Sequence, residues 1–474
     1  MLFSSTVFLF LFLPITIGIY YGLLKKRISR NLFLLLMSLI CYGWGEPKYV
    51  FLMLFCILLN YVGGYYVDYY RSKPKTAKMI LILTVIGNLG ILSIFKYLGF
   101  MLETTNQLFN ANINIPNIIL PIGISFFTFQ GMSYVLDVYM ERGKVQKNPL
   151  NVALYVALFP QLVAGPIVRY ETVATEIENR KETADDFAEG VVRFIKGMGK
   201  KVLLANQFGL IADKAFSMPA GEIAIGFAWL GAIGYMLQIF YDFSGYSDMA
   251  IGLGKMFGFH FNENFNAPYL AKSVSEFWRR WHISLGSWFR DYVYFPLGGS
   301  RVNSNLKLFR NLFVVWLLTG IWHGANWTFI CWGLYFFVWI ALEKFLNLEK
   351  RLQRSRIFSH IYLLLIVILG WVLFRADSIG YAANYIKSMF GLNSSVLLGN
   401  LGLLYWQENR LLLDIGILLC LPLSKLFSRF NIASDSSLYH VKQVATLIIG
   451  ILLFITVLAY LIKSSYNPFI YFNF

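Results

Sequence analysis

Residues 275–296 read SEFWRRWHISLGSWFRDYVYFP, and they place arginines, His282 and many aromatic rings in a chain that is otherwise mostly hydrocarbon. The whole chain is 57% hydrophobic and only 14% charged, whereas soluble chains carry roughly 25% charged residues. A second histidine, His323, lies in 319–327 (TGIWHGANW), a segment with no charged side chain. An ionisable group inside a membrane costs roughly 2.5–3.5 kcal/mol and is a functional candidate by default. The two histidines therefore predict proton-transfer chemistry inside a membrane.

Apolar runs of about 20 residues recur along the chain, which is the length that a helix needs to cross a hydrocarbon core of ~30 Å. We expect an all-α polytopic membrane protein with about 10–12 crossings, together with re-entrant and interfacial helices. The first run lacks a basic n-region and a small-residue cleavage site, so it is expected to be a permanent anchor. The expected spans are 3–24, 31–45, 49–69, 79–100, 117–139, 149–164, 200–217, 222–241, 307–322, 325–346, 357–374, 411–428 and 440–462.

Basic residues predict the topology. Clusters of lysine and arginine follow the first, third and fifth expected spans, at 25–27, 71–78 and 142–147. The positive-inside rule assigns these clusters to the cytoplasm, so the N-terminus and the C-terminal tail are expected outside. The net charge of +16 then reflects cytoplasmic loops. The chain shows no nucleic-acid-binding module, and no nucleic-acid partner is expected.

The chain is expected to form a single integral-membrane domain with five consecutive segments. Four cysteines are scattered in apolar stretches, where they indicate buried small hydrophobes and neither a disulfide framework nor a zinc site. The expected segments are 1–148, the N-terminal spans; 149–201, a re-entrant piece broken by prolines and then cytoplasmic surface helices; 202–346, the catalytic core; 347–462, the C-terminal spans; and 463–474, an extracytoplasmic aromatic tail.

Residues 238–268 place polar groups and glycines among aromatic rings. Tyr241, Asp242 and Asp248 are the candidates for function here. The run Gly252-Leu253-Gly254-Lys255 superficially resembles a phosphate loop, but Met256 occupies the position where Ser or Thr is required. Packing or a bend is the favoured use of these glycines.

If 275–292 is one helix, Arg279, His282 and Arg290 share a polar face, and Trp278, Trp281 and Trp288 lie on an aromatic face. An interfacial helix with snorkelling arginines and a tryptophan belt would give the same pattern. His323 could likewise be a buried, hydrogen-bonded core histidine. The sharper hypothesis is that both histidines serve catalysis.

A neutral histidine is the natural general base near pH 7, and attack of a hydroxyl group on a thioester needs such a base. The chain lacks a Gly-x-Ser-x-Gly nucleophile elbow, and no two of its five histidines lie three or four residues apart. No metal site is therefore expected. A transporter with histidine and arginine along a polar pathway is the competing class, although the internal repeats common in transporters are not seen.

These residues resemble the membrane-bound O-acyltransferase family over essentially the whole chain. The match rests on 278–282, 288–294 and Trp322-His323-Gly324, with 121–130, 159–166 and 241–248 in support. The branch that acetylates alginate and peptidoglycan is the most similar, and D-alanyl transferases of teichoic acid are relatives.

The resemblance implies a ring of tilted and broken helices around a central funnel. It implies that His323 is the catalytic base and that His282 is the second active-site histidine. The substrate would be an acyl thioester, acetyl-coenzyme A or acyl-carrier phosphopantetheine, with no cofactor bound. The candidates for binding substrate or donor are Arg279, Arg290, Asp291, Trp281, Tyr241, Asp242, Asp248 and Asn326.

The resemblance further implies a bacterial cytoplasmic-membrane enzyme that sends an acyl group, most simply acetyl, outward to a polysaccharide. An extracytoplasmic partner resembling an SGNH hydrolase would complete the transfer, and membrane lipid would surround the protein. D-alanyl transfer to a cell-wall polymer is the alternative. The aromatic C-terminal tail, 467–474, is either an interfacial anchor or an acyl relay through Tyr471, and the relay requires that the tail fold back into the funnel.

Overall fold

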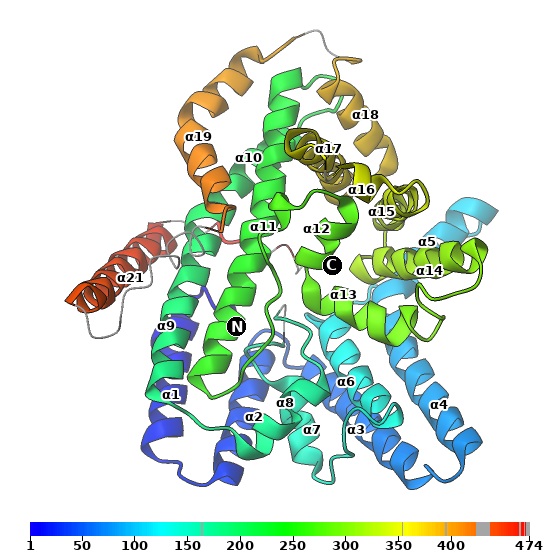
Figure 1. Cartoon of the computed structure of the whole chain (residues 1–474), viewed down its shortest axis with the longest axis vertical. Coiled ribbons are helices and arrows are strands. Elements are labelled where there is room, and N and C mark those ends of the chain that lie inside the picture. Colours follow the sequence, from blue (N-terminus) through cyan, green and yellow to red (C-terminus); the bar gives the residue numbers. More distant parts are fainter. Residues whose placement is uncertain are drawn as a thin grey trace. The chain divides into compact units, whose positions relative to one another are not determined.

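The structure is a computed structural model, and it describes residues 1–474 except 163–164, 353, 394–395, 423–436, 464–465, 469 and 471–474. The described part of the chain is helical and contains no β-strand. Figure 1 labels these helices in the order of the chain. They form two compact units. Unit 1 comprises Met1–Phe194 and Tyr246–Asn262, and unit 2 comprises Ile195–Gly245 and Glu263–Phe474.

Unit 1 holds the helices of the N-terminal half and the end of one long helix that begins in unit 2. Two of its turns are π-helical, η1 (Phe8–Phe12) and η2 (Ser93–Tyr97). Its α-helices are α1 (Leu13–Gly22), α2 (Arg27–Gly43), α3 (Tyr49–Tyr69), α4 (Pro74–Leu92), α5 (Leu98–Phe109), α6 (Ile124–Tyr139), α7 (Pro149–Ala157), α8 (Tyr170–Asn179) and most of α9 (Ala184–Gly199).

Unit 2 holds the remaining helices. Its shorter helical pieces are η3 (Lys200–Ala205), η4 (Pro268–Leu270) and η5 (Arg290–Tyr294). Its α-helices are α10 (Asn206–Phe216), most of α11 (Ile225–Met256), α12 (Val274–Arg280), α13 (Ile283–Phe289), α14 (Asn305–His323), α15 (Trp327–Phe345), α16 (Leu348–Leu352), α17 (Arg356–Arg375), α18 (Ile379–Met389), α19 (Gly399–Leu419) and α21 (Ser437–Lys463).

Each expected span contains a helix, although the boundaries differ. Within the described residues, five helical stretches are long and apolar enough to cross a membrane: Tyr49–Tyr69, Pro74–Phe109, Trp327–Phe345, Arg356–Arg375 and Gln443–Lys463. The second of these runs from α4 through the π-helical turn η2 into α5, so it is longer than the expected span 79–100. An all-helical membrane protein is confirmed, whereas the number of crossings and the ring arrangement stay predictions.

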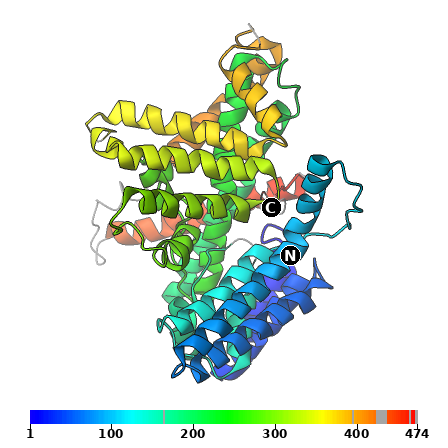
Figure 2. The same cartoon turned by 90° about the vertical axis from the view of Figure 1, so that its right-hand side faces the viewer.

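In unit 1, α3 packs against α4 and α6 (Figure 2). A Cβ atom on Gly64 would lie 2.4 Å from the ring of Tyr134, so the helices approach where α3 lacks a side chain. Beside this contact Asn60 and Asn88 exchange amide hydrogen bonds of 2.9 and 3.0 Å. Because both asparagines are fully buried, this pair satisfies polar groups that would otherwise be costly in an apolar bundle.

The glycines in the second half of α11 serve packing, and the helix is continuous through them. A Cβ atom on Gly252 would lie 2.6 Å from the carbonyl oxygen of Gly190 on α9. The glycines therefore allow the two backbones to approach within unit 1, and of the two uses that the sequence left open, packing is confirmed.

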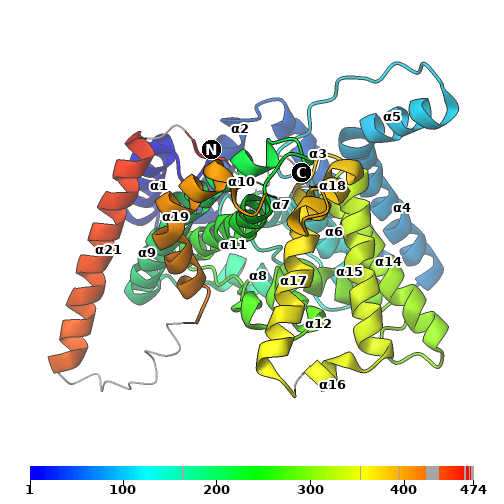
Figure 3. The same ribbon diagram turned by 90° about the horizontal axis from the view of Figure 1, so that it is seen from above.

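In unit 2, α14, α15 and α17 lie side by side (Figure 3). Their facing sides bury large aromatic rings, among them Trp332 and Trp371, which are 0% and 1% exposed. The same hydrophobic cluster includes Trp281 at the end of α12 and Ile470 near the C-terminus. This cluster fixes the short helix α12 against the long helices, and the candidate site forms beside it.

Candidate active site

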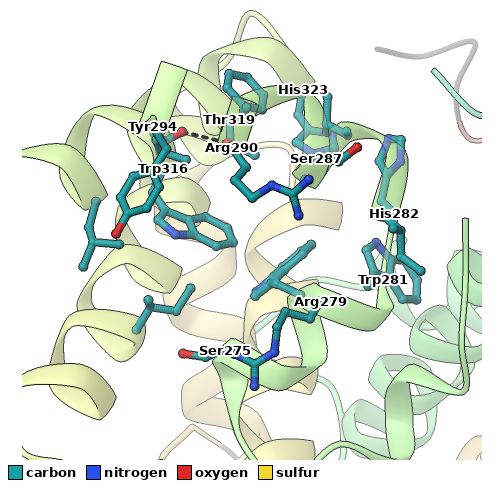
Figure 4. A pocket seen from close by; sticks show the side chains of 18 residues that line it. Ser275, Arg279, Trp281, His282, Ser287, Arg290, Tyr294, Trp316, Thr319 and His323 are labelled. Carbon is teal, nitrogen blue, oxygen red and sulfur yellow. Dashed lines mark hydrogen bonds between the residues drawn. The ribbon is translucent and has the colours of Figure 1, made fainter. Parts of the chain in front are cut away.

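A cavity of about 520 Å³ lies in unit 2, between α12, α13, η5, α14 and α15. Its wall includes both histidines of the sequence analysis, His282 and His323, although they lie on different helical segments. Trp281, Arg279 and Arg290 also line it (Figure 4). The fold therefore brings five of the predicted site residues to one space.

Residues 275–292 do not form the single helix that would place their polar side chains on one face, because the chain breaks at Trp281 and His282. Helix α12 ends at Arg280, and α13 begins at Ile283. His282 adopts the left-handed conformation, with φ of 46° and ψ of 52°. For a residue with a Cβ atom this conformation costs roughly 1–2 kcal/mol, so the surrounding structure must impose it. As a result, His282 does not share a helical face with Arg279 and Arg290.

Asn264 fixes the tautomer of His282. The backbone N–H of Ser284 donates to Oδ1 of Asn264 at 3.1 Å, and this donor identifies the oxygen of the amide. The same oxygen lies 3.2 Å from Nδ1 of His282. Because Oδ1 can only accept, Nδ1 carries the proton in the neutral ring, and Nε2 keeps its lone pair. Nε2 is buried and has no hydrogen-bond partner among the described residues.

Burial favours the neutral form of this ring. His282 is 2% exposed and lies outside the five apolar helical stretches described above. Burial lowers the pKa of His282 to about 3. At neutral pH the ring is therefore uncharged and presents an acceptor nitrogen, which suits a group that receives a hydrogen bond from a substrate hydroxyl.

His323 is the last residue of α14 and is enclosed by aromatic rings. Its ring centroid lies 4.9 Å from that of Trp332, 5.0 Å from Trp322 and 5.2 Å from Phe374, each with an interplanar angle near a right angle. Such edge-to-face contacts fix the plane of the imidazole. Trp322 also lies 6.0 Å from the ring of His282, so one indole contacts both histidines.

Two glycines set the position of the helix that carries His323. A Cβ atom on Gly320 of α14 would lie 2.6 Å from the carbonyl oxygen of Phe329, and one on Gly333 of α15 would lie 2.5 Å from that of Trp316. The backbones of α14 and α15 are therefore in direct contact one turn before His323. The two helices thus approach each other closely beside this histidine.

The two cavity arginines differ in how they are held. Arg290 binds the buried carboxylate of Asp291 through Nε at 2.8 Å and Nη2 at 3.1 Å, and its side chain is 53% exposed. In Figure 4 its guanidinium points into the middle of the cavity, whereas that of Arg279 points away from the histidines. Arg279 is 60% exposed and pairs with Glu349 at 2.8 Å. Both cations remain accessible to an anionic ligand.

The other predicted site residues lie elsewhere. Tyr241 donates a hydrogen bond to the carbonyl oxygen of Gly416 at 2.5 Å. Asp242 pairs with Lys201, and Asp248 belongs to unit 1, where it pairs with Arg193 at 2.9 Å. Asn326 caps α15 by accepting from the backbone N–H of Thr328. None of these four residues lines the cavity, and Tyr471 lies outside the described residues.

The sequence analysis missed Asn264 and Glu343. Asn264 lies in a polar break whose short-range pattern gives no sign of a contact with His282. Glu343 is 1% exposed on α15 and accepts the backbone N–H groups of Val274 and Ser275 at 2.6 and 2.8 Å. It is the only acid in the expected span 325–346, and an intramembrane acid is a signal that could have been followed.

Comparisons with known proteins identify the family of the chain. The family model for membrane-bound O-acyltransferases matches residues 141–379, which include the whole cavity. The chain is 39% identical to the probable alginate O-acetylase AlgI of Pseudomonas putida, over 100% of both chains. It is 33% identical to the peptidoglycan O-acetyltransferase of Helicobacter pylori, over 98% of this chain and 90% of the other.

A more distant relative is the teichoic acid D-alanyltransferase of Bacillus subtilis, which is 31% identical over 48% of this chain and 60% of its own length. Two observations support the assignment: the chain is similar over its full length to two O-acetylating proteins, and the family model covers the residues of the cavity. The chain belongs to the membrane-bound O-acyltransferase family, and it is an O-acyltransferase.

Proposed function

We propose that this protein is a membrane O-acetyltransferase that uses His323 as its general base. The observation that carries the proposal is that His323 and His282, 41 positions apart in the sequence, line one cavity. Two full-length relatives are named for the O-acetylation of alginate and of peptidoglycan, and this supports acetyl as the acyl group. The acceptor is proposed to be an extracytoplasmic polysaccharide.

The proposed reaction transfers an acyl group from a thioester to a hydroxyl group. The imidazole of His323 takes the hydroxyl proton while the oxygen attacks the carbonyl carbon. The carbon–sulfur bond then breaks, and the leaving thiolate receives the proton from the imidazolium. The products are an ester and a free thiol. General-base assistance of this kind contributes typically 10²–10⁴-fold to a rate.

His282 is proposed to orient the acceptor. Its Nε2 keeps a lone pair because Asn264 holds the proton on Nδ1, so it can accept a hydrogen bond from a hydroxyl group. Arg290 and Arg279 are proposed to bind the phosphates of acetyl-coenzyme A or of a phosphopantetheine carrier. Arg290 already forms a bidentate contact with a carboxylate, the geometry that also suits phosphate.

We further propose that the protein lies in the bacterial cytoplasmic membrane, with its N-terminus and C-terminal tail on the outer side. The acyl group would enter from a cytoplasmic donor and leave outward, through Tyr471 as relay, to a partner resembling an SGNH hydrolase. The aromatic tail of the sequence supports the relay, and so does the burial of Ile470, which is 8% exposed in the core of unit 2.

The test is transfer of label from radiolabelled acetyl-coenzyme A by the purified full-length protein in detergent. We expect label on the protein or on an added glycan, and a loss of roughly 10²–10⁴-fold in His323→Ala. His360→Ala is the matched control, because His360 lies on α17 and does not line the cavity. Transfer at the wild-type rate by His323→Ala would reject His323 as the base.

The donor decides between acetyl and D-alanyl transfer. The same assay with a D-alanyl thioester carrier should give little or no label. Transfer of D-alanine in place of acetate would contradict the proposed acyl group but not the role of His323 as the base. The function of this protein would then be closer to that of the teichoic acid D-alanyltransferase.

A further inference from the structure

Polar side chains of the core helices hold a C-terminal segment of unit 2 at Tyr466, Pro468 and Ile470. Two of its carbonyl groups and one N–H group, on alternate residues, are bound. Asn206 donates to the carbonyl oxygen of Tyr466 at 3.3 Å, Lys201 donates to that of Pro468, and the N–H of Ile470 donates to Asp242 at 2.9 Å. Because these are main-chain atoms, they fix the path of the backbone itself.

A buried ion pair lies at the centre of these contacts. Nζ of Lys201, on η3, is 2.6 Å from Oδ1 of Asp242, on α11, and the two side chains are 3% and 2% exposed. Taking two charges out of water is costly unless further hydrogen bonds satisfy their remaining donors and lone pairs. Pro468 and Ile470 supply such bonds, so the ion pair and the tail stabilise each other.

The outer end of the segment fits a space made by a glycine. Oη of Tyr466 donates to Oδ2 of Asp213 at 2.6 Å, and Arg375 binds the other oxygen of that carboxylate at 2.9 Å. A Cβ atom on Gly209 of α10 would lie 2.7 Å from Oη of Tyr466. Polar groups thus bind the phenol, and α10 leaves room for it.

The inner end reaches the hydrophobic cluster that supports the cavity. Ile470 belongs to the same cluster as Trp281, which lines the cavity beside His282, and Trp332, which packs against His323. The bonds to Lys201 and Asp242 therefore fix Ile470 within the cluster that supports the cavity.

We infer that Lys201, Asn206, Asp213 and Asp242 form a C-terminal seat, a set of positioning residues that fixes Tyr466, Pro468 and Ile470 for acyl transfer through the tail. The inference deepens the proposed function and rests on it, since an acyl relay at Tyr471 needs a tail whose course is set. The seat also gives Asp242 a role different from the substrate contact that the sequence suggested.

The seat is tested first without any activity measurement. The full-length protein in detergent is treated with a carboxypeptidase, and trimming is followed by intact mass. We expect trimming of the wild type to leave Ile470 on the chain, because its N–H is bound to Asp242. In Lys201→Met/Asp242→Leu, which removes both charges and leaves no lone buried charge, trimming should pass Ile470 at least 10-fold faster.

The matched control is Arg193→Met/Asp248→Leu, which removes the ion pair that α9 and α11 form in unit 1. Its tail should stay protected as in the wild type. If the seat variant does not fold, Gly209→Leu tests the same point by displacing Tyr466 without changing a charge. The seat would be overturned if the tail of the folded seat variant were trimmed as slowly as that of the wild type. It would also be overturned if the tail of the control variant were trimmed as fast as that of the seat variant.

Acyl transfer then tests the role of the seat. The variants that release the tail should lose about 10-fold or more in kcat, with an unchanged KM for the thioester, because the donor cavity is intact. Release of the tail with an unchanged kcat would overturn the positioning role. A protected tail in a wild-type protein that transfers no acyl group would instead reject the proposed function and leave the seat standing.

Discussion

The carboxylate of Glu343 accepts the backbone N–H of Val274 at 2.6 Å, and through this bond α15 holds the first turn of α12. Its second oxygen accepts the N–H of Ser275 at 2.8 Å. Helix α12 carries Arg279 on the cavity wall, and α15 carries Trp332 against His323. One buried acid thus joins two walls of the site.

We expect Glu343→Ala to destabilise the protein and to lower the transfer rate. It leaves the buried N–H of Val274 without an acceptor, at about 1–3 kcal/mol, and the partly buried N–H of Ser275 loses its acceptor too. Glu343→Gln keeps one acceptor oxygen and should fall between Ala and the wild type. Thermal unfolding and the acetyl-transfer assay measure both effects. Glu349→Ala is the control, because its exposed pair with Arg279 contributes at most about 1 kcal/mol; equal losses in Glu343→Ala and Glu349→Ala would contradict the role of Glu343.

Gly333→Ala should displace α14 and with it His323. The added methyl group would lie 2.5 Å from the carbonyl oxygen of Trp316, so the two backbones must separate. A misplacement of ~1 Å at a reacting group can cost about 10²-fold in rate, and we expect a loss of that order in kcat.

The control for this change is Gly380→Ala on α18, where a Cβ atom meets nothing within 4 Å. It should leave the transfer rate unchanged and stabilise the protein by about 0.4–1 kcal/mol. Wild-type activity in Gly333→Ala would show that the contact between α14 and α15 does not set the position of His323.

Asn264→Leu should release the tautomer of His282. The variant removes the acceptor that holds the proton on Nδ1, so the ring can protonate Nε2 instead and lose its free lone pair. We expect a fall of about 10- to 100-fold in transfer, the range seen when groups that orient a histidine are lost. Nitrogen-15 NMR of histidine-labelled protein distinguishes the two tautomers.

Ser284→Ala provides the comparison, since it removes one hydroxyl donor to Asn264 at 3.0 Å and leaves the backbone N–H in place. The tautomer should persist in this variant. A wild-type tautomer in Asn264→Leu would mean that another group holds the proton.

His260 should make the stability of unit 1 depend on pH. Burial lowers the pKa of His260, but hydrogen bonds to Glu176 at 2.9 Å and Asp186 at 3.1 Å outweigh it, and the net pKa is raised. A raised folded-state pKa gives stability that is complete below the unfolded value near 6.5 and is lost as pH rises through the folded-state pKa.

The comparison is thermal unfolding of the wild type and His260→Gln across pH 5–9. The wild type should be the more stable at pH 5–6, by a small margin because His260 is half exposed, and the difference should vanish at the alkaline end. A difference that grows with pH would contradict the sign of the effect.

The sequence was a good guide to the helices and to the two histidines, because apolar length and intramembrane ionisable groups are local signals. It could not place residues whose roles depend on distant contacts. Asp248 and Asn326 carry the same polar signal as Asp242, yet one pairs with Arg193 and the other caps α15. The helical periodicity of the sequence also continues through His282, because the local pattern contains no signal for a residue in the left-handed conformation.

Asn264 is a functional candidate that the sequence pattern could not reveal. It meets His282 across 18 positions of irregular chain, and helical spacing says nothing about such a pair. The positions of Pro468 and Ile470 likewise depend on Lys201 and Asp242, more than 200 positions earlier. These features are set by tertiary packing, whereas the sequence pattern reports only each segment's own preference.

The left-handed backbone of His282 has a practical consequence for anyone engineering this protein. Glycine adopts that conformation without the steric cost, so His282→Gly should fold better than His282→Ala, by about 1 kcal/mol. A library screened only for yield or heat resistance would therefore tolerate glycine at position 282 more readily than alanine. Such a screen would enrich well-behaved protein that has lost one of its two cavity imidazoles, and function has to be selected alongside expression.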